Sequence, residues 1–259
     1  MIAEINGTSV YYEILGTTGG PVVLLHGWGC SGDLMRNLGQ ELAKTHRVLI
    51  PDFPGFGKSG KPPEPWGVPE YADCLKRLME MEGWIPCSAI GHSFGCRVAA
   101  WAESQWPEMF TKMIFTGAAG LKAPQTEEGK KRAEAFQRGK QIAHKIEKIP
   151  FLREAGERME ERLRKKYGSS DYNALDAEMR QTFVRVIGLD LRDRYPLIQA
   201  PTLLIWGDAD TETPLWMGQE MEKLIPDSGL VILEGGSHFA YLEQSDRFNV
   251  IARHFLTEE

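Results

Sequence analysis

The chain has 259 residues, with 30 Lys and Arg against 36 Asp and Glu, which gives a formal net charge of −6 at pH 7. Its 42% hydrophobic and 25% charged residues are typical of a folded globular protein, and its length suits one large domain or a domain with an insertion. An acidic chain lacks the surplus of Lys and Arg that general nucleic-acid binding requires, and no run approaches the roughly 20 apolar residues that span a bilayer. We therefore expect no nucleic-acid partner and no membrane span, while the composition leaves the oligomeric state open.

The N-terminal residues lack the charged and then apolar layout of a secretory signal. None of the 4 cysteines has the C-x-x-C spacing of a zinc site, and nothing in their spacing indicates a disulfide framework. We therefore expect reduced thiols, a cytoplasmic protein and no bound metal.

The predicted elements begin with a β-hairpin over residues 3–14 that turns at Asn6-Gly7. Short apolar runs predict buried strands at residues 21–25, 47–50, 88–90, 112–115, 202–206 and 229–233. Helical spacing and helix-start signals predict helices at residues 33–44, 69–81, 94–105, 216–224 and 245–256. Strands that alternate with helices at short intervals predict a mostly parallel sheet covered by helices on both faces.

This alternation lapses between residues 121 and 195. Residues 122–168 are charged and helical, with an apolar stripe that includes Phe136, and a second helical piece covers residues 176–187. We predict an α/β core formed by residues 1–120 and 196–259, interrupted by a helical insertion at residues 121–195.

The insertion also carries a distinct charge. Residues 122–168 contain 14 Lys and Arg against 8 Asp and Glu, or +6, which leaves 16 against 28, or −12, for the rest of the chain. A basic surface of this kind suits an acidic carrier or a carboxylate-bearing substrate, and a solvated helical hairpin accounts for it equally well.

Two glycine-rich segments resemble nucleotide-binding motifs. Residues 27–32 fit G-x-G-x-x-G between a strand and a helix, and Asp52 ends the next strand, as in a dinucleotide-binding fold. Two features argue against a dinucleotide site. A hairpin precedes the strand, whereas this motif usually follows the first strand of its domain, and the large side chains of His26 and Trp28 lie where a pyrophosphate requires small residues. Residues 55–60 repeat the pattern, but the prolines that follow leave no helix N-terminus for a phosphate, so we predict a tight turn there.

The segment from Gly91 to Gly95 carries the clearest chemical signal. It reads G-x-S-x-G and lies between a predicted strand and a predicted helix, which places Ser93 on a sharp turn. Such a turn exposes the hydroxyl for activation by a neighbouring base, directs the following backbone N–H at a developing oxyanion, and requires small flanking residues. The pattern predicts a nucleophilic serine at position 93.

On these residues the chain resembles the α/β-hydrolase fold family, over nearly its whole length. The resemblance implies an acid and a base that follow the serine in that order. Residues 206–214 are similar to the family's W-G-x-x-D-x-x-x-P stretch and indicate Asp210 as the acid, with Asp208 and Glu212 as alternatives. His238 follows the last strand, where the family carries its base.

The resemblance also implies a role for each of the two glycine-rich segments. Residues 26–29 are similar to the family's oxyanion loop, which offers the Trp28 N–H as a second donor beside the Phe94 N–H. Residues 52–59 match the family's D-x-x-G-x-G-x-S turn. The helical insertion is similar to the family's cap, and it makes Phe136 and Phe183, with Trp28 and Phe94, candidates for an apolar pocket wall.

The resemblance implies a serine hydrolase that cleaves a small-molecule carboxylic ester through an acyl-enzyme, without a metal or an organic cofactor. Carbon–carbon bond hydrolases of ring-cleavage products and carrier-protein methyl ester esterases are alternatives within the family. The former typically have Asn before the nucleophile and Trp after the base, where this chain has His92 and Phe239, and the latter usually have Trp before the nucleophile. These departures favour a carboxylesterase. A small-molecule receptor with a vestigial triad is the alternative outside enzymes.

Overall fold

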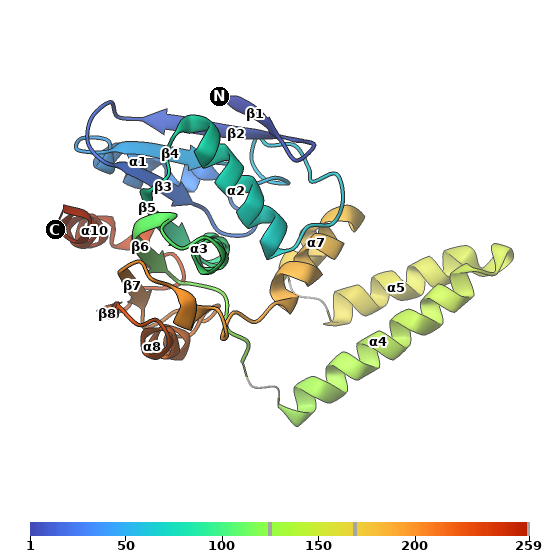
Figure 1. Cartoon of the computed structure of the whole chain (residues 1–259). Coiled ribbons are helices and arrows are strands. Elements are labelled where there is room, and N and C mark those ends of the chain that lie inside the picture. The colour runs from blue at the N-terminus through green and yellow to red at the C-terminus, as the bar shows by residue number, and fades with distance from the viewer. Residues whose placement is uncertain (124–125, 168–169, 258–259) are drawn as a thin grey trace. The chain divides into compact units, whose positions relative to one another are not determined.

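The computed structural model describes residues 1–123, 126–167 and 170–257 (Figure 1). The chain divides into two compact units, one formed by Met1–Leu121 with Val184–Glu259 and the other by Lys122–Phe183.

The first unit is built on an eight-stranded sheet with the order β1-β2-β4-β3-β5-β6-β7-β8. The strands are β1 (Ile2–Ile5), β2 (Thr8–Leu15), β3 (Pro21–Leu25), β4 (Arg47–Pro51), β5 (Cys87–His92), β6 (Phe110–Thr116), β7 (Thr202–Gly207) and β8 (Ser228–Leu233). Strand β2 is antiparallel to both β1 and β4, and all the other neighbours are parallel. The predicted α/β-hydrolase fold, with its mostly parallel sheet flanked by helices, is confirmed.

The hairpin at the N-terminus forms for the predicted reason. Asn6 and Gly7 have φ angles of 52° and 79°, as the two central residues of a tight type I′ turn require. The central strands are apolar on both faces, and Val23 and Leu24 of β3 are completely buried. Such strands are stable only between two helical layers.

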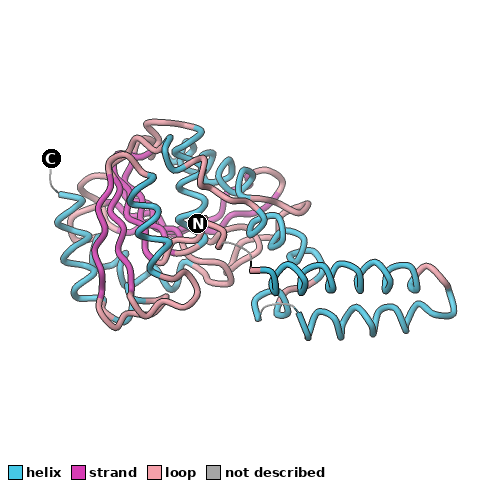
Figure 2. The backbone as a smooth tube through the Cα atoms, turned by 90° about the horizontal axis from the view of Figure 1, so that it is seen from below, coloured by secondary structure: helices cyan, strands magenta, loops and turns pink. Residues whose placement is uncertain are grey.

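Helices cover both faces of this sheet (Figures 1 and 2). Helix α1 packs with α10 on one face, and α2 packs with α3 on the other. The helices of this unit are α1 (Arg36–Leu42), α2 (Val68–Glu82), α3 (Phe94–Gln105), α8 (Leu215–Leu224), α9 (Ala240–Glu243) and α10 (Ser245–Thr257), with short 3-10 turns at Gly32–Met35 and Tyr195–Leu197. Helix α2 begins with Pro69 in its first turn, where the Glu70 side chain accepts the Gly67 N–H, and it ends at a left-handed Gly83.

The second unit is helical. Helices α4 (Glu127–Glu147) and α5 (Arg153–Tyr167) lie side by side as an antiparallel hairpin (Figure 1), and α6 (Ser170–Ala174) and the first part of α7 (Ala177–Gly188) follow. The chain reverses at a 3-10 turn, Pro150–Leu152, because proline disrupts a continuing helix. A Cβ on Gly139 would lie 2.9 Å from the Leu163 side chain, so the two helices meet closely at this glycine.

The second unit is shorter than the predicted insertion of residues 121–195, since residues 184–195 group with the first unit. Arg97 of α3 gives one physical reason, because its guanidinium donates to the carbonyl oxygens of Val186 at 2.9 Å and Leu189 at 2.5 Å. The role of the insertion as a cap stays a prediction. None of the helices in the described ranges combines the length and the apolar character needed to cross a membrane.

Candidate active site

Ser93 lies at the junction between β5 and α3, at the C-terminal end of the central strand. Its backbone has φ 51° and ψ −106°, and a positive φ is strained for a residue with a side chain. Two backbone hydrogen bonds hold this turn: the Ser93 N–H donates to the Thr116 carbonyl at 3.1 Å, and the Ala119 N–H donates to the Ser93 carbonyl at 3.2 Å. The partly exposed Ser93 side chain is therefore presented on a rigid, sharp turn.

The glycines on either side of Ser93 are required by close backbone contacts. A Cβ on Gly91 would lie 2.7 Å from the Cys96 nitrogen, and a Cβ on Gly95 would lie 2.3 Å from the carbonyl oxygen of Leu25 in β3. Any larger residue at either position would displace backbone. The G-x-S-x-G spacing thus follows from the packing of the turn.

His238 lies in the loop between β8 and α9 and pairs with Asp210, which follows β7. The His238 Nδ1 is 2.9 Å from the Asp210 Oδ2, and the Asp210 side chain is completely buried while that of His238 is 14% exposed. Because a carboxylate oxygen only accepts, this contact places the proton on Nδ1 and leaves Nε2 unprotonated in the neutral ring. Such an imidazole is ready to accept a proton at Nε2.

Asp210 is held in its ionised form by several donors. Its Oδ1 accepts the N–H groups of Glu212 and Thr213, both at 2.9 Å, and its Oδ2 also accepts the Thr213 hydroxyl at 2.8 Å. Burial raises the pKa of Asp210, but the hydrogen bonds from His238 and Thr213 outweigh burial and leave this pKa below its ordinary value. The carboxylate is therefore charged at neutral pH.

The structure separates Asp210 from the two alternative acids. The Asp208 Oδ1 accepts the Gly235 N–H at 2.6 Å, and Glu212 contributes a backbone N–H to Asp210. No carboxylate follows β6, because residues 116–119 are Thr, Gly, Ala and Ala, and a Cβ on Gly117 would already lie 3.1 Å from the His238 Nδ1. Asp210 is thus the carboxylate that meets His238.

The loop that carries Trp28 is fixed by two buried residues. The His26 Nε2 accepts the Phe53 N–H at 2.9 Å and its Nδ1 donates to the Gly27 carbonyl at 2.7 Å, while burial lowers the pKa of His26 to about 4. The carboxylate of Asp52, which is 4% exposed, accepts the N–H groups of Gly32 and Lys58, both at 2.7 Å. Because Asp52 is committed to these donors, residues 27–32 form a braced turn rather than the predicted alternative of a dinucleotide site.

The aromatic candidates fall into two groups. The rings of Trp28 and Phe94 meet edge to face with centroids 5.3 Å apart, and Phe94 is only 2% exposed while Trp28 is partly exposed. Phe136 and Phe183 belong to the second unit, where each meets a tyrosine ring. The structure brings Trp28 and Phe94 together beside Ser93, and the pocket role of Phe136 and Phe183 stays a prediction.

Comparison with known proteins assigns this arrangement to a family. The model of the α/β hydrolase fold family matches residues 20–245. The chain belongs to this family. A 2-hydroxy-6-oxononadienedioate/2-hydroxy-6-oxononatrienedioate hydrolase from a Pseudomonas species is 28% identical, covering 98% of this chain and 93% of that protein.

Two further proteins are similar to this α/β hydrolase over nearly the whole of its length. A pimeloyl-acyl-carrier-protein methyl ester esterase from Aliivibrio fischeri is 23% identical, covering 97% of this chain and 98% of that protein. The crystal structure of a bromoperoxidase from Bacillus anthracis matches with a TM-score of 0.76 and 26% identity, covering 100% of this chain and 99% of that one. The chain is therefore similar, over nearly its whole length, to proteins that are named for different activities.

His92 of this hydrolase makes contacts that its motif does not predict. Its side chain lies against His238: the His92 and His238 ring centroids are 4.7 Å apart, and the His92 Nε2 is 2.9 Å from the His238 carbonyl oxygen. Burial lowers the pKa of His92 to about 3. A histidine next to Ser93 was the available signal in the sequence, but its contact with His238 spans 146 residues along the chain.

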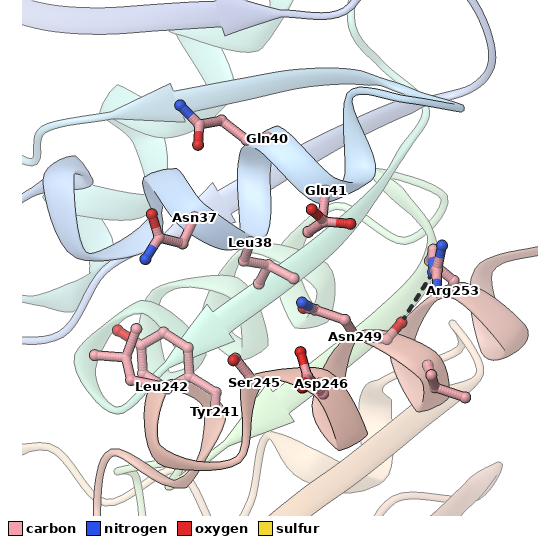
Figure 3. A pocket seen from close by; sticks show the side chains of 11 residues that line it. Asn37, Leu38, Gln40, Glu41, Tyr241, Leu242, Ser245, Asp246, Asn249 and Arg253 are labelled. Atoms are coloured by element: carbon pink, nitrogen blue, oxygen red, sulfur yellow. Dashed lines mark hydrogen bonds between the residues drawn. The ribbon is translucent and has the colours of Figure 1, made fainter.

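A separate groove of about 430 Å³ lies between α1 and α10 (Figure 3). Its polar lining includes Glu41, Asp246 and Arg253, and neither histidine nor cysteine is among the lining residues. The groove thus has neither a serine–histidine nor a cysteine–histidine pair among its lining residues. One of its residues, Tyr241, packs against His92 with ring centroids 4.9 Å apart.

Proposed function

We propose that this α/β hydrolase is a carboxylesterase with Ser93 as nucleophile, His238 as general base and Asp210 as the acid of the triad. His238 Nε2 takes the hydroxyl proton as Ser93 attacks the ester carbonyl, and Asp210 fixes the ring tautomer and stabilises the imidazolium. His238 then protonates the departing alcohol. Water, activated by the same imidazole, releases the acid from the acyl-enzyme.

The observation that carries this proposal is the strained Ser93 turn together with the hydrogen-bonded pair of His238 and the buried Asp210. A φ of 51° at a serine is stored strain, and the surrounding backbone bonds maintain it. In the described part of the chain no hydrogen bond joins the Ser93 hydroxyl to His238. In hydrolases without substrate, catalytic contacts of this kind are often long and tighten in the complex.

The oxyanion formed at the carbonyl needs two donors near Ser93. Phe94 opens helix α3, so its N–H has no acceptor within the helix and lies at the positive end of the helix dipole. The Trp28 N–H lies in the loop braced by His26 and Asp52. Each donor of this type typically contributes about 3 kcal/mol to stabilisation of the transition state.

The proposed substrate is a small-molecule ester, and the helical insertion at residues 121–195 is proposed as a cap. Trp28 and Phe94 are the apolar candidates of the core unit, and Phe136 and Phe183 are those of the helical insertion. The scheme uses neither a metal nor an organic cofactor, because His238 and Asp210 supply the proton transfer and the charge stabilisation.

Labelling with a fluorophosphonate tests the assignment of the nucleophile. We expect wild-type protein to react at one serine, Ser93→Ala to lose the label, and Ser88→Ala, on the same strand but bonded to Thr111, to keep it. Circular dichroism of each variant checks that it is folded. A folded wild-type protein that does not react would refute the proposed esterase and favour the receptor with a vestigial triad.

A second candidate is hydrolysis of a carbon–carbon bond in a ring-cleavage product. The 28% identity to a 2-hydroxy-6-oxononadienedioate/2-hydroxy-6-oxononatrienedioate hydrolase favours this candidate. In contrast, His92 directly before Ser93 and Phe239 directly after His238 favour an ester substrate. Turnover of p-nitrophenyl esters of increasing chain length, measured beside turnover of a ring-cleavage dienoate, separates the two. A kcat/KM for the dienoate above that for every ester would assign the carbon–carbon activity.

A further inference from the structure

The loop that carries His238 is anchored to the acid-bearing loop after β7. The Gly235 N–H donates to the Asp208 Oδ1 at 2.6 Å, and the Gly236 carbonyl accepts the Ala209 N–H at 3.0 Å. These bonds hold the base against Asp210. They do not fix it relative to the elbow, the sharp turn of residues 91–95, because Ser93 lies between a different strand and helix.

The His92 side chain makes the connection to the elbow. Its Nε2 lies 2.9 Å from the carbonyl oxygen of His238. Among the described residues, this hydrogen bond is the one that joins the His238 loop, between β8 and α9, to strand β5. His92 is also the last residue of β5, directly before Ser93. One side chain therefore links the backbone of the nucleophile to the backbone of the base.

The chemistry of this contact defines the form of the ring. A carbonyl oxygen only accepts, so the His92 Nε2 carries the proton. Its Nδ1 is buried without a hydrogen-bond partner among the described residues, a position that suits an unprotonated nitrogen and excludes a charged ring. The groups that affect its charge are His238, Asp210 and His26, and burial dominates them by lowering the pKa of His92 to about 3.

Ring contacts fix the orientation of this imidazole. His92 packs between His238, at a centroid distance of 4.7 Å, and the rings of Phe239 and Tyr241, each at 4.9 Å. The side chain is 1% exposed. A donor locked in this way can hold its acceptor with little loss of conformational freedom.

We propose that His92 is a positioning residue, whose Nε2–H, donated to the His238 carbonyl, aligns the base with the Ser93 hydroxyl. This inference rests on the proposed serine hydrolase. Its physical basis is that a displacement of about 1 Å between reacting groups costs on the order of 100-fold in rate.

Two substitutions separate the hydrogen bond from the packing. His92→Phe keeps an aromatic ring and removes the donor, whereas His92→Gln retains an N–H donor of similar reach. Tyr241→Phe is the matched control, because it preserves the ring that packs on His92 and removes a buried hydroxyl with no hydrogen-bond partner among the described residues. For each variant we would measure kcat and KM with a p-nitrophenyl ester, the rate of fluorophosphonate labelling, and Tm.

We expect His92→Phe to lower kcat and the labelling rate by roughly 10- to 100-fold while KM changes by less than about 3-fold. His92→Gln should recover most of this loss, and Tyr241→Phe should resemble the wild type. If His92→Phe is unfolded, nitrogen chemical shifts of ¹⁵N-histidine-labelled wild type provide the second measurement, with His92 protonated at Nε2 and not at Nδ1.

Three results would overturn the positioning role and leave the proposed function intact. They are a kcat and labelling rate of His92→Phe equal to those of the wild type, an equal loss of activity in the Phe and Gln variants, and a His92 ring protonated at Nδ1 and not at Nε2. Absence of labelling in the wild type would instead overturn the proposed function, and this inference with it.

Discussion

The buried histidines His26 and His92 predict a loss of stability in mild acid. In the folded protein the pKa of His92 is lowered to about 3 and that of His26 to about 4, in both cases mainly by burial. In the unfolded chain both take the ordinary value of about 6.5. As the pH falls below about 6.5, the unfolded chain therefore binds protons that the folded protein does not, and the free energy of unfolding decreases until the folded pKa is reached.

The magnitude follows from the difference in bound protons. Each pKa unit corresponds to about 1.36 kcal/mol, so between pH 7 and pH 5 each histidine lowers the free energy of unfolding by about 2 kcal/mol. The two together contribute about 4 kcal/mol, a large part of the 5–15 kcal/mol that is typical of folded proteins. Above pH 7 this contribution is absent.

Urea unfolding at pH 7, 6 and 5 measures the effect, followed by tryptophan fluorescence. His92→Gln removes one titrating group, so its free energy of unfolding should fall by about 2 kcal/mol less than that of the wild type between pH 7 and pH 5. His254→Gln, at an exposed position on α10, is the matched control for loss of a histidine. If the pH dependence of His92→Gln equals that of the wild type, the buried, neutral state of His92 is wrong.

Two further substitutions probe the candidate site. Asp210→Asn should lower kcat for a p-nitrophenyl ester by about 10⁴-fold with little change in Tm, because the amide favours the wrong His238 tautomer; an esterase rate near that of the wild type would rule out Asp210 as the acid. Gly95→Ala should lower the free energy of unfolding by roughly 1–3 kcal/mol in urea titrations, since its Cβ would lie 2.3 Å from the Leu25 carbonyl oxygen. An unchanged urea midpoint in Gly95→Ala would show that the elbow adjusts without cost.

Local patterns were sufficient to predict most elements of the core. The Asn6-Gly7 turn and the apolar runs of the central strands depend on short stretches of sequence, and the structure has them within a few residues of the predicted bounds. The boundaries of the helices within the insertion were harder to predict. Its periodicity persists through residues 122–168, while Pro150 turns the chain back between α4 and α5.

The sequence by itself determined the elbow and the order of the candidate residues, because a sharp strand-to-helix turn requires glycines at fixed spacing around Ser93. It left Asp210, Asp208 and Glu212 as alternative acids, since all three lie in one loop. Only the tertiary structure showed which carboxylate meets His238, because that contact joins loops from different strands.

The same physical reason applies to Asp52 and His92. Asp52 fits two motifs in the sequence, and its hydrogen bonds to Gly32 and Lys58 assign it to the turn that braces the Trp28 loop. His92 occupies a variable position of its motif, yet in the folded chain its ring lies against His238. Hydrogen bonds between distant segments depend on how the strands are ordered in the sheet, and local sequence does not encode that order.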